Sequence, residues 1–187
     1  MKIMVIYGSS REDGNTELLA EKALEGLECT RIYLRHHQVQ AIVDKRHAPE
    51  GFSPVDDDHD KMIRLLLEHD VVIFATPLYW YGMSGPMKDF VDRWSQSLRD
   101  PGLGFREKIR SRQGYLIMTG GSDARLKGLP LVLQFAHIFG FVGMEFAGYL
   151  IGTGGKPGQV LDDERALLEA GWLNRELRRR SALRTER

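Results

Sequence analysis

Apolar residues along this chain gather in short segments that are predicted to be strands, and each is followed by a segment of helical periodicity. The predicted strands cover residues 2–7, 30–34, 71–75, 115–118 and 144–151, and the apolar run is uninterrupted in residues 3–7, 71–75 and 115–118. Unbroken apolar runs are typical of strands that helices cover on both faces, as in parallel sheets. The helical segments have their apolar positions within residues 19–27, 62–67, 87–98, 129–139 and 161–180. This alternation predicts a single α/β domain, residues 1–187, with a doubly wound five-stranded parallel sheet, for which the strand order 2-1-3-4-5 is one of two common solutions.

The segment around which the other predicted elements are arranged is residues 71–94. Pro77 lacks a backbone donor and biases Thr76 to an extended geometry, so the strand should end there. The loop that follows contains three consecutive aromatic residues, and its sequence is Leu78, Tyr79, Trp80, Tyr81 and Gly82. Three neighbouring aromatic side chains on one surface loop cannot all point into the core, and ligands of open parallel sheets bind beyond the carboxyl ends of strands. The loop is therefore a candidate binding site, and capping of the core is the alternative interpretation.

A second candidate site follows the first predicted strand. Its loop offers backbone amides, hydroxyl groups, a guanidinium group and the start of a helix, through Gly8, Ser9, Ser10, Arg11, Gly14, Asn15 and Thr16. These groups together favour a bound phosphate, because the positive end of the helix dipole adds to the donors. An ordinary turn capped by Asn15 and Thr16 is the alternative, since the same residue types are common in turns.

A third loop of small residues, Thr119, Gly120, Gly121 and Ser122, follows the fourth predicted strand and can also offer backbone donors. Named phosphate and hydrolase motifs do not fit the chain. The nearest imitation of a P-loop, residues 152–157, has Pro157 where a hydroxyl is needed, and Ser84 misses the nucleophile-elbow pattern by one residue. No G-x-G-x-x-G follows the first strand, which weakens a dinucleotide-binding interpretation.

Composition narrows the class of partner. Lys plus Arg equals Asp plus Glu at 26 each, so no net field favours nucleic acid, and a small molecule is the expected partner. One cysteine, Cys29, excludes an intramolecular disulfide and fits a reducing compartment. No apolar run approaches the length of a membrane span and residues 1–7 leave no room for a signal peptide, so we expect a cytoplasmic protein with no membrane partner.

Several polar residues are expected to carry no chemistry. The irregular segment 35–55 contains His36, His37 and His47, but without cysteine or ligand-like spacing these read as solvated loop histidines, and no metal site is expected. His137 lies among apolar neighbours and is expected in the core. The acidic run 56–60 precedes a helix, where the helix dipole is an adequate explanation.

The two main loops resemble those of a known family. The segment Gly8-Ser9-Ser10-Arg11 through Gly14-Asn15-Thr16 and the segment ATPLYWYGMSGPMKDFVDRW are similar to the phosphate loop and the flavin-ring loop of NAD(P)H-dependent FMN reductases and iron-sulfur-flavoprotein-like oxidoreductases, whose fold is flavodoxin-like. The resemblance implies that FMN is the cofactor, with its phosphate bound by Ser9, Arg11, Asn15 and Thr16. It further implies that the flavin ring is lined by Pro77, Leu78, Tyr79, Trp80, Tyr81 and Gly82, with Thr119, Gly120 and Gly121 as a looser third match. Segment 35–55 lacks the cysteines of iron-sulfur members, so no cluster is expected.

If FMN is bound, the hydride chemistry belongs to the cofactor and no catalytic acid or base is obligatory. NADPH or NADH would reduce the ring, and a small electron acceptor such as a quinone, a nitroaromatic or a flavin would reoxidise it. The alternative is a flavodoxin-type electron carrier without NAD(P)H turnover, although carriers need charge to meet their partners and this chain is neutral. A phospho-accepting receiver domain is disfavoured by Ser9, Ser10, Thr76 and Pro77 where carboxylates would be needed. The apolar residues of segment 35–55 and the family resemblance together predict a homodimer or homotetramer.

Overall fold

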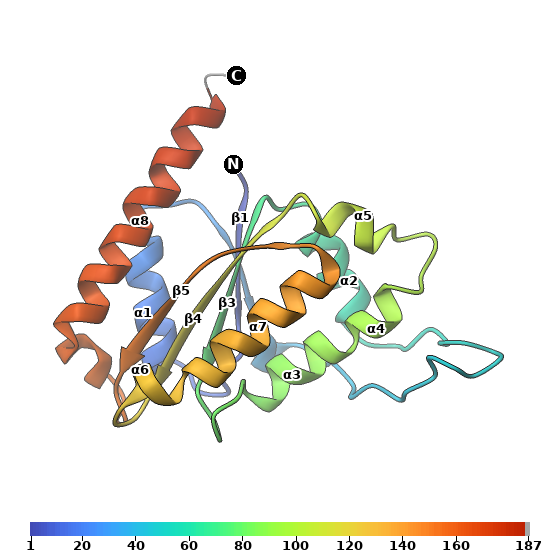
Figure 1. Ribbon diagram of the computed structural model, residues 1–187, viewed down its shortest axis with the longest axis horizontal. Helices are drawn as coiled ribbons and strands as arrows, with labels where there is room; N and C mark the ends of the chain where they lie inside the picture. The colour runs from blue at the N-terminus through green and yellow to red at the C-terminus, as the bar shows by residue number, and fades with distance from the viewer. Residues whose placement is uncertain (186–187) are drawn as a thin grey trace.

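The computed structural model describes residues 1–185, which form one five-stranded parallel sheet flanked by helices (Figure 1). The strands lie in the order β2-β1-β3-β4-β5, and all neighbouring pairs are parallel. Their bounds are β1 Ile3–Tyr7, β2 Thr30–Tyr33, β3 Val71–Pro77, β4 Gln113–Gly120 and β5 Glu145–Thr153. The predicted flavodoxin-like order 2-1-3-4-5 is confirmed.

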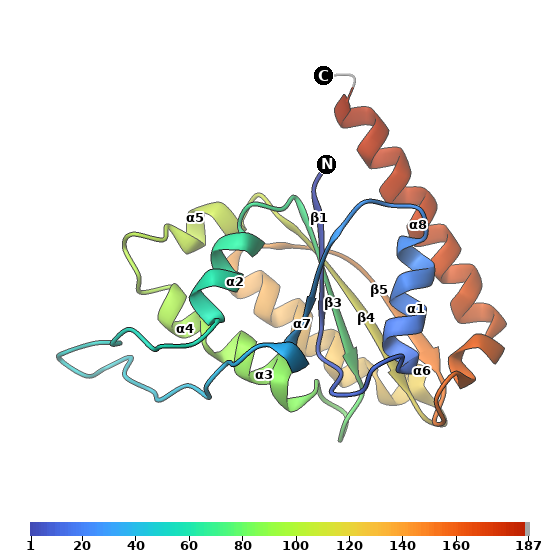
Figure 2. The same cartoon turned by 180° about the vertical axis from the view of Figure 1, so that it is seen from behind.

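Helices cover both faces of this sheet, as Figures 1 and 2 show from opposite sides. One face is covered by α1 Asn15–Leu24 and α8 Glu164–Thr185. The other face is covered by α2 His59–Leu66, α3 Gly85–Asp92, α4 Trp94–Ser97, α5 Phe105–Ile109, α6 Ala124–Lys127 and α7 Leu129–Val142. Two short 3₁₀ segments, η1 Leu34–His36 and η2 Gln159–Asp162, complete the described elements. Among residues 1–185, no helix is long and apolar enough to cross a membrane.

Side chains of each strand alternate between two cores. Met4 and Ile6 of β1 pack with α2, α3 and α7, whereas Ile3, Val5 and Tyr7 pack with α1 and α8. Central strand β3 is fully buried from Val71 to Thr76, which explains why its sequence is apolar without alternation.

Residues 37–58 form a long excursion, which we call the arm, that projects from the body of the molecule between η1 and α2 (Figure 1). A buried ion pair closes its base, because Arg93 Nη1 lies 2.7 Å from Asp57 Oδ2 and their side chains are 2% and 0% exposed. Arg93 Nη1 also donates to the carbonyl of Gln40, and the carboxylates of Asp57 and Asp58 accept from the amides of Gln40 and Gln38. The helix-dipole explanation of the acidic run was therefore incomplete: Asp57 and Asp58 hold the two ends of the arm together.

Two further expectations were wrong or imprecise. His137 is exposed, because it lies on the outer side of α7 rather than with Phe135 and Phe139 in the core. The last helix begins at Glu164 instead of residue 161. The Asp163 side chain accepts a hydrogen bond from the amide of Ala166, so Asp163 caps α8 and separates it from η2.

Candidate functional site

Three predicted binding loops lie at the same edge of the sheet. They follow β1, β3 and β4, which are neighbours in the strand order, and they emerge together at the lower edge in Figure 1. From β1 the chain continues to β2 on one side of the sheet, whereas from β3 it continues to β4 on the other side, so the topological switch point lies between β1 and β3. Ligands of open α/β sheets bind at such a switch point. The fold therefore brings together the loops that the sequence singled out separately.

The first loop, residues 8–14, leaves the start of α1 without a protein cap. Gly14 occupies the N-cap position, and no side chain accepts a hydrogen bond there. The first amides of a helix have no intrahelical partner, so those of α1 remain available to an anion. Arg11 is exposed beside them, whereas Ser9 is buried and its hydroxyl bonds the backbone of Arg11, 3.1 Å from both N and O. This arrangement, which we call the cradle, has the donors that a phosphate group needs.

Arg35 contacts the cradle, and the sequence analysis did not identify this residue. Its Nη1 lies 3.1 Å from Glu17 Oε2 and 3.4 Å from the carbonyl of Arg11, and its guanidinium stacks over the ring of Tyr33. The side chain is only 12% exposed, and its Nε has no hydrogen-bond partner among residues 1–185. A cation directly after β2, the strand next to β1, was the signal that could have identified it.

Asn15 does not cap its own helix, as the alternative of an ordinary capped turn required. Its Nδ2 donates to the carbonyls of Gly154 and Lys156, each at 2.8 Å, and its Oδ1 accepts from the amide of Val160. Thr16 is also turned inward, with its hydroxyl 2.5 Å from that of Thr119. Asn15 and Thr16 therefore join the cradle to the loops after β5 and β4.

Ser84 joins the aromatic loop to the cradle in the same way. Its hydroxyl donates to the carbonyl of Gly8 at 2.6 Å and accepts from the amide of Met87 as the N-cap of α3. A Cβ atom at Gly8 would lie 2.8 Å from Ser84 Oγ, so only glycine allows this approach. Backbone bonds from Leu78 to Thr119 and from Gly154 to Gly120 complete a ring of contacts around the four loops.

The aromatic loop is a tight hairpin whose tip is strained. Tyr79 and Gly82 exchange two backbone hydrogen bonds of 3.0 and 2.9 Å, and Trp80 and Tyr81 between them have φ angles of 50° and 65°. Positive φ at both central residues is typical of type I′ turns, which favour Asn and Gly. Trp80 is 96% exposed, so the tip does not cap the core as the alternative interpretation required.

A cavity of about 250 Å³ lies between this hairpin and the loop after β4. Its lining is Leu78, Trp80, Tyr81, Gly121, Ser122, Ala124 and Lys127. Gly120 and Gly121 play different parts: a Cβ at Gly120 would lie 3.1 Å from Leu78, whereas nothing lies within 4 Å of one at Gly121. The open side of Gly121 and the aromatic wall opposite suit a flat group.

A carboxylate that is 10% exposed, that of Asp163, holds the loop after β5. Asp163 accepts from Arg125 Nη2 and from the amides of Thr153 and Ala166. Burial alone would raise the pKa of Asp163, but these hydrogen bonds and the positive charge of Arg125 outweigh it and lower the pKa below its usual range. Asp163 is thus held ionised, as the turn that presents Gly154 to Asn15 requires.

The family profile described as NADPH-dependent FMN reductase matches residues 1–150. A Bacillus subtilis (strain 168) protein named "Putative NAD(P)H-dependent FMN-containing oxidoreductase YwqN" is 51% identical over 174 residues, which cover 92% of this chain and 96% of that protein. "Iron-sulfur flavoprotein MJ1083" of Methanocaldococcus jannaschii is 33% identical over 145 residues, covering 74% of this chain and 71% of that one. Among solved structures, the "Trp Repressor Binding Protein from Bacillus subtilis" is 44% identical with a TM-score of 0.78, covering 91% of this chain and 96% of that one.

These matches agree with the predicted resemblance, and they extend over most of the chain, including the cradle, the hairpin and the loop after β4. An uncapped helix start and an open pocket with an aromatic wall fit a cofactor with one phosphate and one planar ring. The chain belongs to the NADPH-dependent FMN reductase family, and it is an FMN-dependent NAD(P)H oxidoreductase.

Proposed function

We propose that the chain passes hydride from NADPH or NADH through FMN to a small acceptor, namely a quinone, a nitroaromatic or a free flavin. The observation that carries this proposal is the cavity between the hairpin and Gly121, because it offers an apolar wall and an unobstructed glycine to a flat molecule. When bound, FMN supplies the hydride chemistry. The residues of the chain position the reactants, and no side-chain acid or base is assigned.

Each loop has a separate part in this proposal. Arg11 and the free amides of α1 bind the phosphate, while Ser9, Asn15 and Thr16 shape the cradle through their bonds to neighbouring backbone and side chains. Residues 77–82 line the ring, and Thr119, Gly120 and Gly121 form its other wall. Tyr79, Trp80 and Tyr81, which are 50%, 96% and 57% exposed, provide the surface on which a nicotinamide or an acceptor stacks.

The test is anaerobic stopped-flow of the FMN-loaded protein. NADPH or NADH should bleach the flavin absorbance, and a quinone, a nitroaromatic or added FMN should restore it in a second mixing step. If dithionite bleaches the flavin and neither nicotinamide does, the proposal fails and the electron-carrier alternative holds. The rates with the three acceptors identify which class the site prefers.

A substitution in the cavity sharpens this test. Gly121→Ala adds a methyl group toward open space, so the fold should tolerate it, but reduction by NADPH should slow by roughly tenfold, about 1.4 kcal/mol. Gly140→Ala is the matched control, because a Cβ at Gly140 also meets nothing within 4 Å and Gly140 lies in α7, which does not line the cavity. Equal rates of flavin reduction in the two variants would show that the cavity takes no part in the reaction with NADPH.

We also propose that the protein is a homodimer or homotetramer in which the arm contacts a neighbouring copy. Val43 is 72% exposed and Ala41 is exposed as well, although the base of the arm is locked by Arg93 and Asp57. A projection with a closed base and exposed apolar residues is suited to a surface on another subunit. A monomeric mass by light scattering at micromolar concentration would contradict this.

Iron and sulfide should be absent from the purified protein, since Cys29 alone cannot hold a cluster within the chain.

A further inference from the structure

A small cavity lies between the arm and the body of the molecule. It is formed by residues 40–45 of the outgoing part of the arm, residues 52–55 of the returning part, Arg93, and Gln96 of α4. The apolar part of its lining comes from Ile42, Phe52, Pro54 and Val55. Its volume is about 220 Å³. An apolar cavity of about 150 Å³ holds one benzene molecule, so this cavity has room for one six-membered ring with a small substituent. We call it the arm cavity.

A buried cation lines the arm cavity and is only partly hydrogen-bonded. The side chain of Arg93 is 2% exposed; its Nε donates to Gln96 Oε1 at 2.9 Å, and its Nη1 donates to the carbonyl of Gln40 and to Asp57. Its Nη2 has no hydrogen-bond partner among residues 1–185. A buried donor without a partner costs free energy, and in a native protein such a group calls for an explanation. Because protein groups hold the other two nitrogens, Nη2 is the one that can donate to a ligand.

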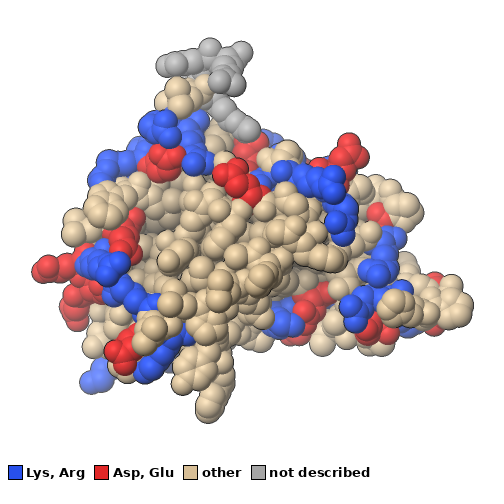
Figure 3. All heavy atoms as spheres, viewed as in Figure 1, with Lys and Arg blue, Asp and Glu red and all other residues tan. Residues whose placement is uncertain are grey.

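The charges of the lining favour a ligand with one negative charge. Arg93 and Lys45 line the arm cavity, and no carboxylate of residues 1–185 lines it. Asp57 already neutralises Arg93, whereas Lys45 Nζ lies 3.7 Å from a carboxylate oxygen of Glu50, whose side chain is 62% exposed. A loose, exposed ion pair contributes little, so Lys45 can turn toward a ligand at small cost. Basic and acidic side chains both appear along the arm in Figure 3, so this selection comes from the lining and not from the charge of the whole arm.

We propose that the arm cavity binds a small monocarboxylate with an apolar ring or branched chain. A carboxylate oxygen accepts a hydrogen bond from Arg93 Nη2, Lys45 supplies the opposite charge, and the apolar part of the ligand packs against Phe52 and Val55. A phosphate monoester would bring more negative charge than Lys45 balances. A purely apolar molecule would leave Nη2 without a partner.

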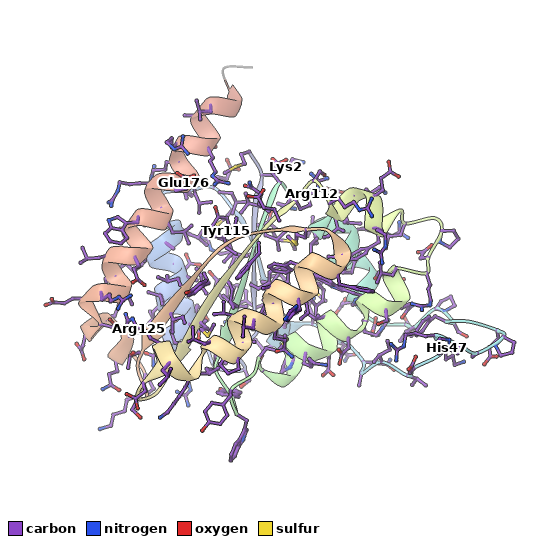
Figure 4. The ribbon with its side chains drawn as sticks, in the orientation of Figure 1. Lys2, His47, Arg112, Tyr115, Arg125 and Glu176 are labelled. Carbon is purple, nitrogen blue, oxygen red and sulfur yellow. The ribbon has the colours of Figure 1, made fainter. Side chains whose placement is uncertain are left out.

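The arm cavity is separate from the cavity assigned to the flavin ring, since the two share no lining residue. His47, labelled in Figure 4, marks the arm, which projects to one side, whereas the three binding loops emerge at the lower edge of Figure 1. The inference does not rest on the proposed hydride transfer, and the two can fail separately.

Benzoate is the probe, and benzyl alcohol is its matched uncharged control. Isothermal titration calorimetry of the FMN-loaded protein should give a dissociation constant of about 1 mM or below for benzoate, which lies within the limits for a ligand of this size. Benzyl alcohol should bind about tenfold more weakly, because it lacks the charge-assisted hydrogen bond. The flavin absorbance and the mass by light scattering should not change. Equal affinity for the two probes, no binding of benzoate, or a flavin spectrum perturbed by benzoate would overturn the inference.

Two substitutions locate the binding. Lys45→Gln removes a half-buried cation of the lining and should weaken benzoate binding about threefold to fivefold. Lys61→Gln is the matched control, because Lys61 is exposed on α2 and does not line the arm cavity, and it should bind benzoate as wild type does. Arg93→Lys keeps a positive charge beside Asp57 but removes Nη2, and it should abolish measurable binding. Since this change also alters the base of the arm, Lys45→Gln is the decisive variant: benzoate affinity equal to that of Lys61→Gln would overturn the inference.

Discussion

The cradle after β1 and the aromatic hairpin after β3 flank the same site, but they are built in opposite ways. In the cradle, Gly8, Asn15 and Thr16 use their polar groups to bond neighbouring loops, Ser9 bonds the backbone of Arg11 within the loop, and Ser9 and Thr16 are buried. In the hairpin, two aromatic residues sit at positive φ, and Trp80 is almost fully exposed. The cradle is held by many contacts outside itself, whereas the hairpin is closed by two bonds between Tyr79 and Gly82.

This difference separates retention of a cofactor from access to it. A loop that must keep a phosphate in place gains from a rigid, fully bonded backbone, because little entropy is lost on binding. A loop that must admit successive flat molecules gains from exposed rings, and backbone strain concentrates at such functional sites. Substitutions in the cradle should therefore affect stability and FMN affinity together, whereas those in the hairpin should separate stability from turnover.

The largest effect is expected at Gly8. Gly8→Ala places a methyl group 2.8 Å from Ser84 Oγ and 3.0 Å from Met87 Cβ, so it should lower the free energy of unfolding by about 2–3 kcal/mol and reduce FMN content. Gly85→Ala, at the nearby start of α3, meets nothing within 4 Å and is the control. Urea unfolding and flavin absorbance measure both consequences. A Gly8→Ala protein as stable as the control would show that the two loops are not tightly joined.

Asn15→Ala should have the next largest effect. It removes three hydrogen bonds to the loop after β5, so we expect the free energy of unfolding to fall by about 2 kcal/mol and the affinity for FMN to decrease. Asn174→Ala is a close control, since its side chain also makes three hydrogen bonds, to Ala23, Glu25 and Arg178, on α8 away from the cradle. Fluorescence titration with FMN should separate them, because Asn174→Ala should lose stability while FMN affinity stays unchanged. Similar FMN affinity in both variants would contradict the part given to Asn15.

Most of the fold followed from local patterns, but the links between the loops did not. Unbroken apolar runs predicted the strands at the centre of the sheet, because both faces of the sheet are buried there, and the strand order followed from the small number of solutions that such sheets allow. The residue types of the cradle pointed to an anion, yet not to which side chains face it. Asn15 is a good cap by composition, but its partners are about 140 residues away, and such contacts leave no local signal.

Segment 35–58 shows the same limit. Asp57 looked like an ordinary acidic residue before a helix, because nothing in its neighbours indicates Arg93, 36 residues later. Arg35 was overlooked for the reason that it opens an irregular stretch, although its contacts run back to the loop after the adjacent strand. His137 illustrates the reverse error, in which apolar neighbours suggested burial on a helix whose outer side is itself apolar.

A change at the hairpin tip should have a smaller effect on stability and one of opposite sign. Replacing Trp80 and Tyr81 by Asn and Gly supplies the residues that a type I′ turn favours and removes two strained aromatics. Stability should rise by about 1 kcal/mol, while the rate of flavin reduction by NADPH falls several-fold because the stacking surface is lost. Thermal unfolding and stopped-flow test the two halves. A variant that is less stable than wild type would show that the turn is not strained.

The smallest effect is expected from pH, and it should appear at the base of the arm, where α2 begins, rather than at either loop. His59 is fully buried beside Phe90, and burial, followed by the positive charge of Arg93, lowers its pKa. A lowered pKa means that the unfolded chain binds a proton more readily than the folded chain once the pH falls below about 6.5. The stability is therefore full above that value and declines as the pH falls toward the folded pKa. His59→Phe should remove this part of the decline between pH 7 and pH 5 in urea unfolding, whereas His47→Phe, at an exposed position in the arm, should keep it.

Asp57 adds a second decline in stability at lower pH. Burial would raise the pKa of Asp57, but hydrogen bonds from Gln40, Arg93 and His59 lower it, so protonation below about 4 opposes folding. Flavin absorbance should persist at pH 5 in both variants, because the cradle contacts Arg35 and Ser84 and shares no hydrogen bond with His59. Loss of FMN in step with the titration of His59 would instead show that the base of the arm is coupled to the cradle. It would contradict the conclusion that retention of the cofactor and access to it depend on separate parts of the molecule.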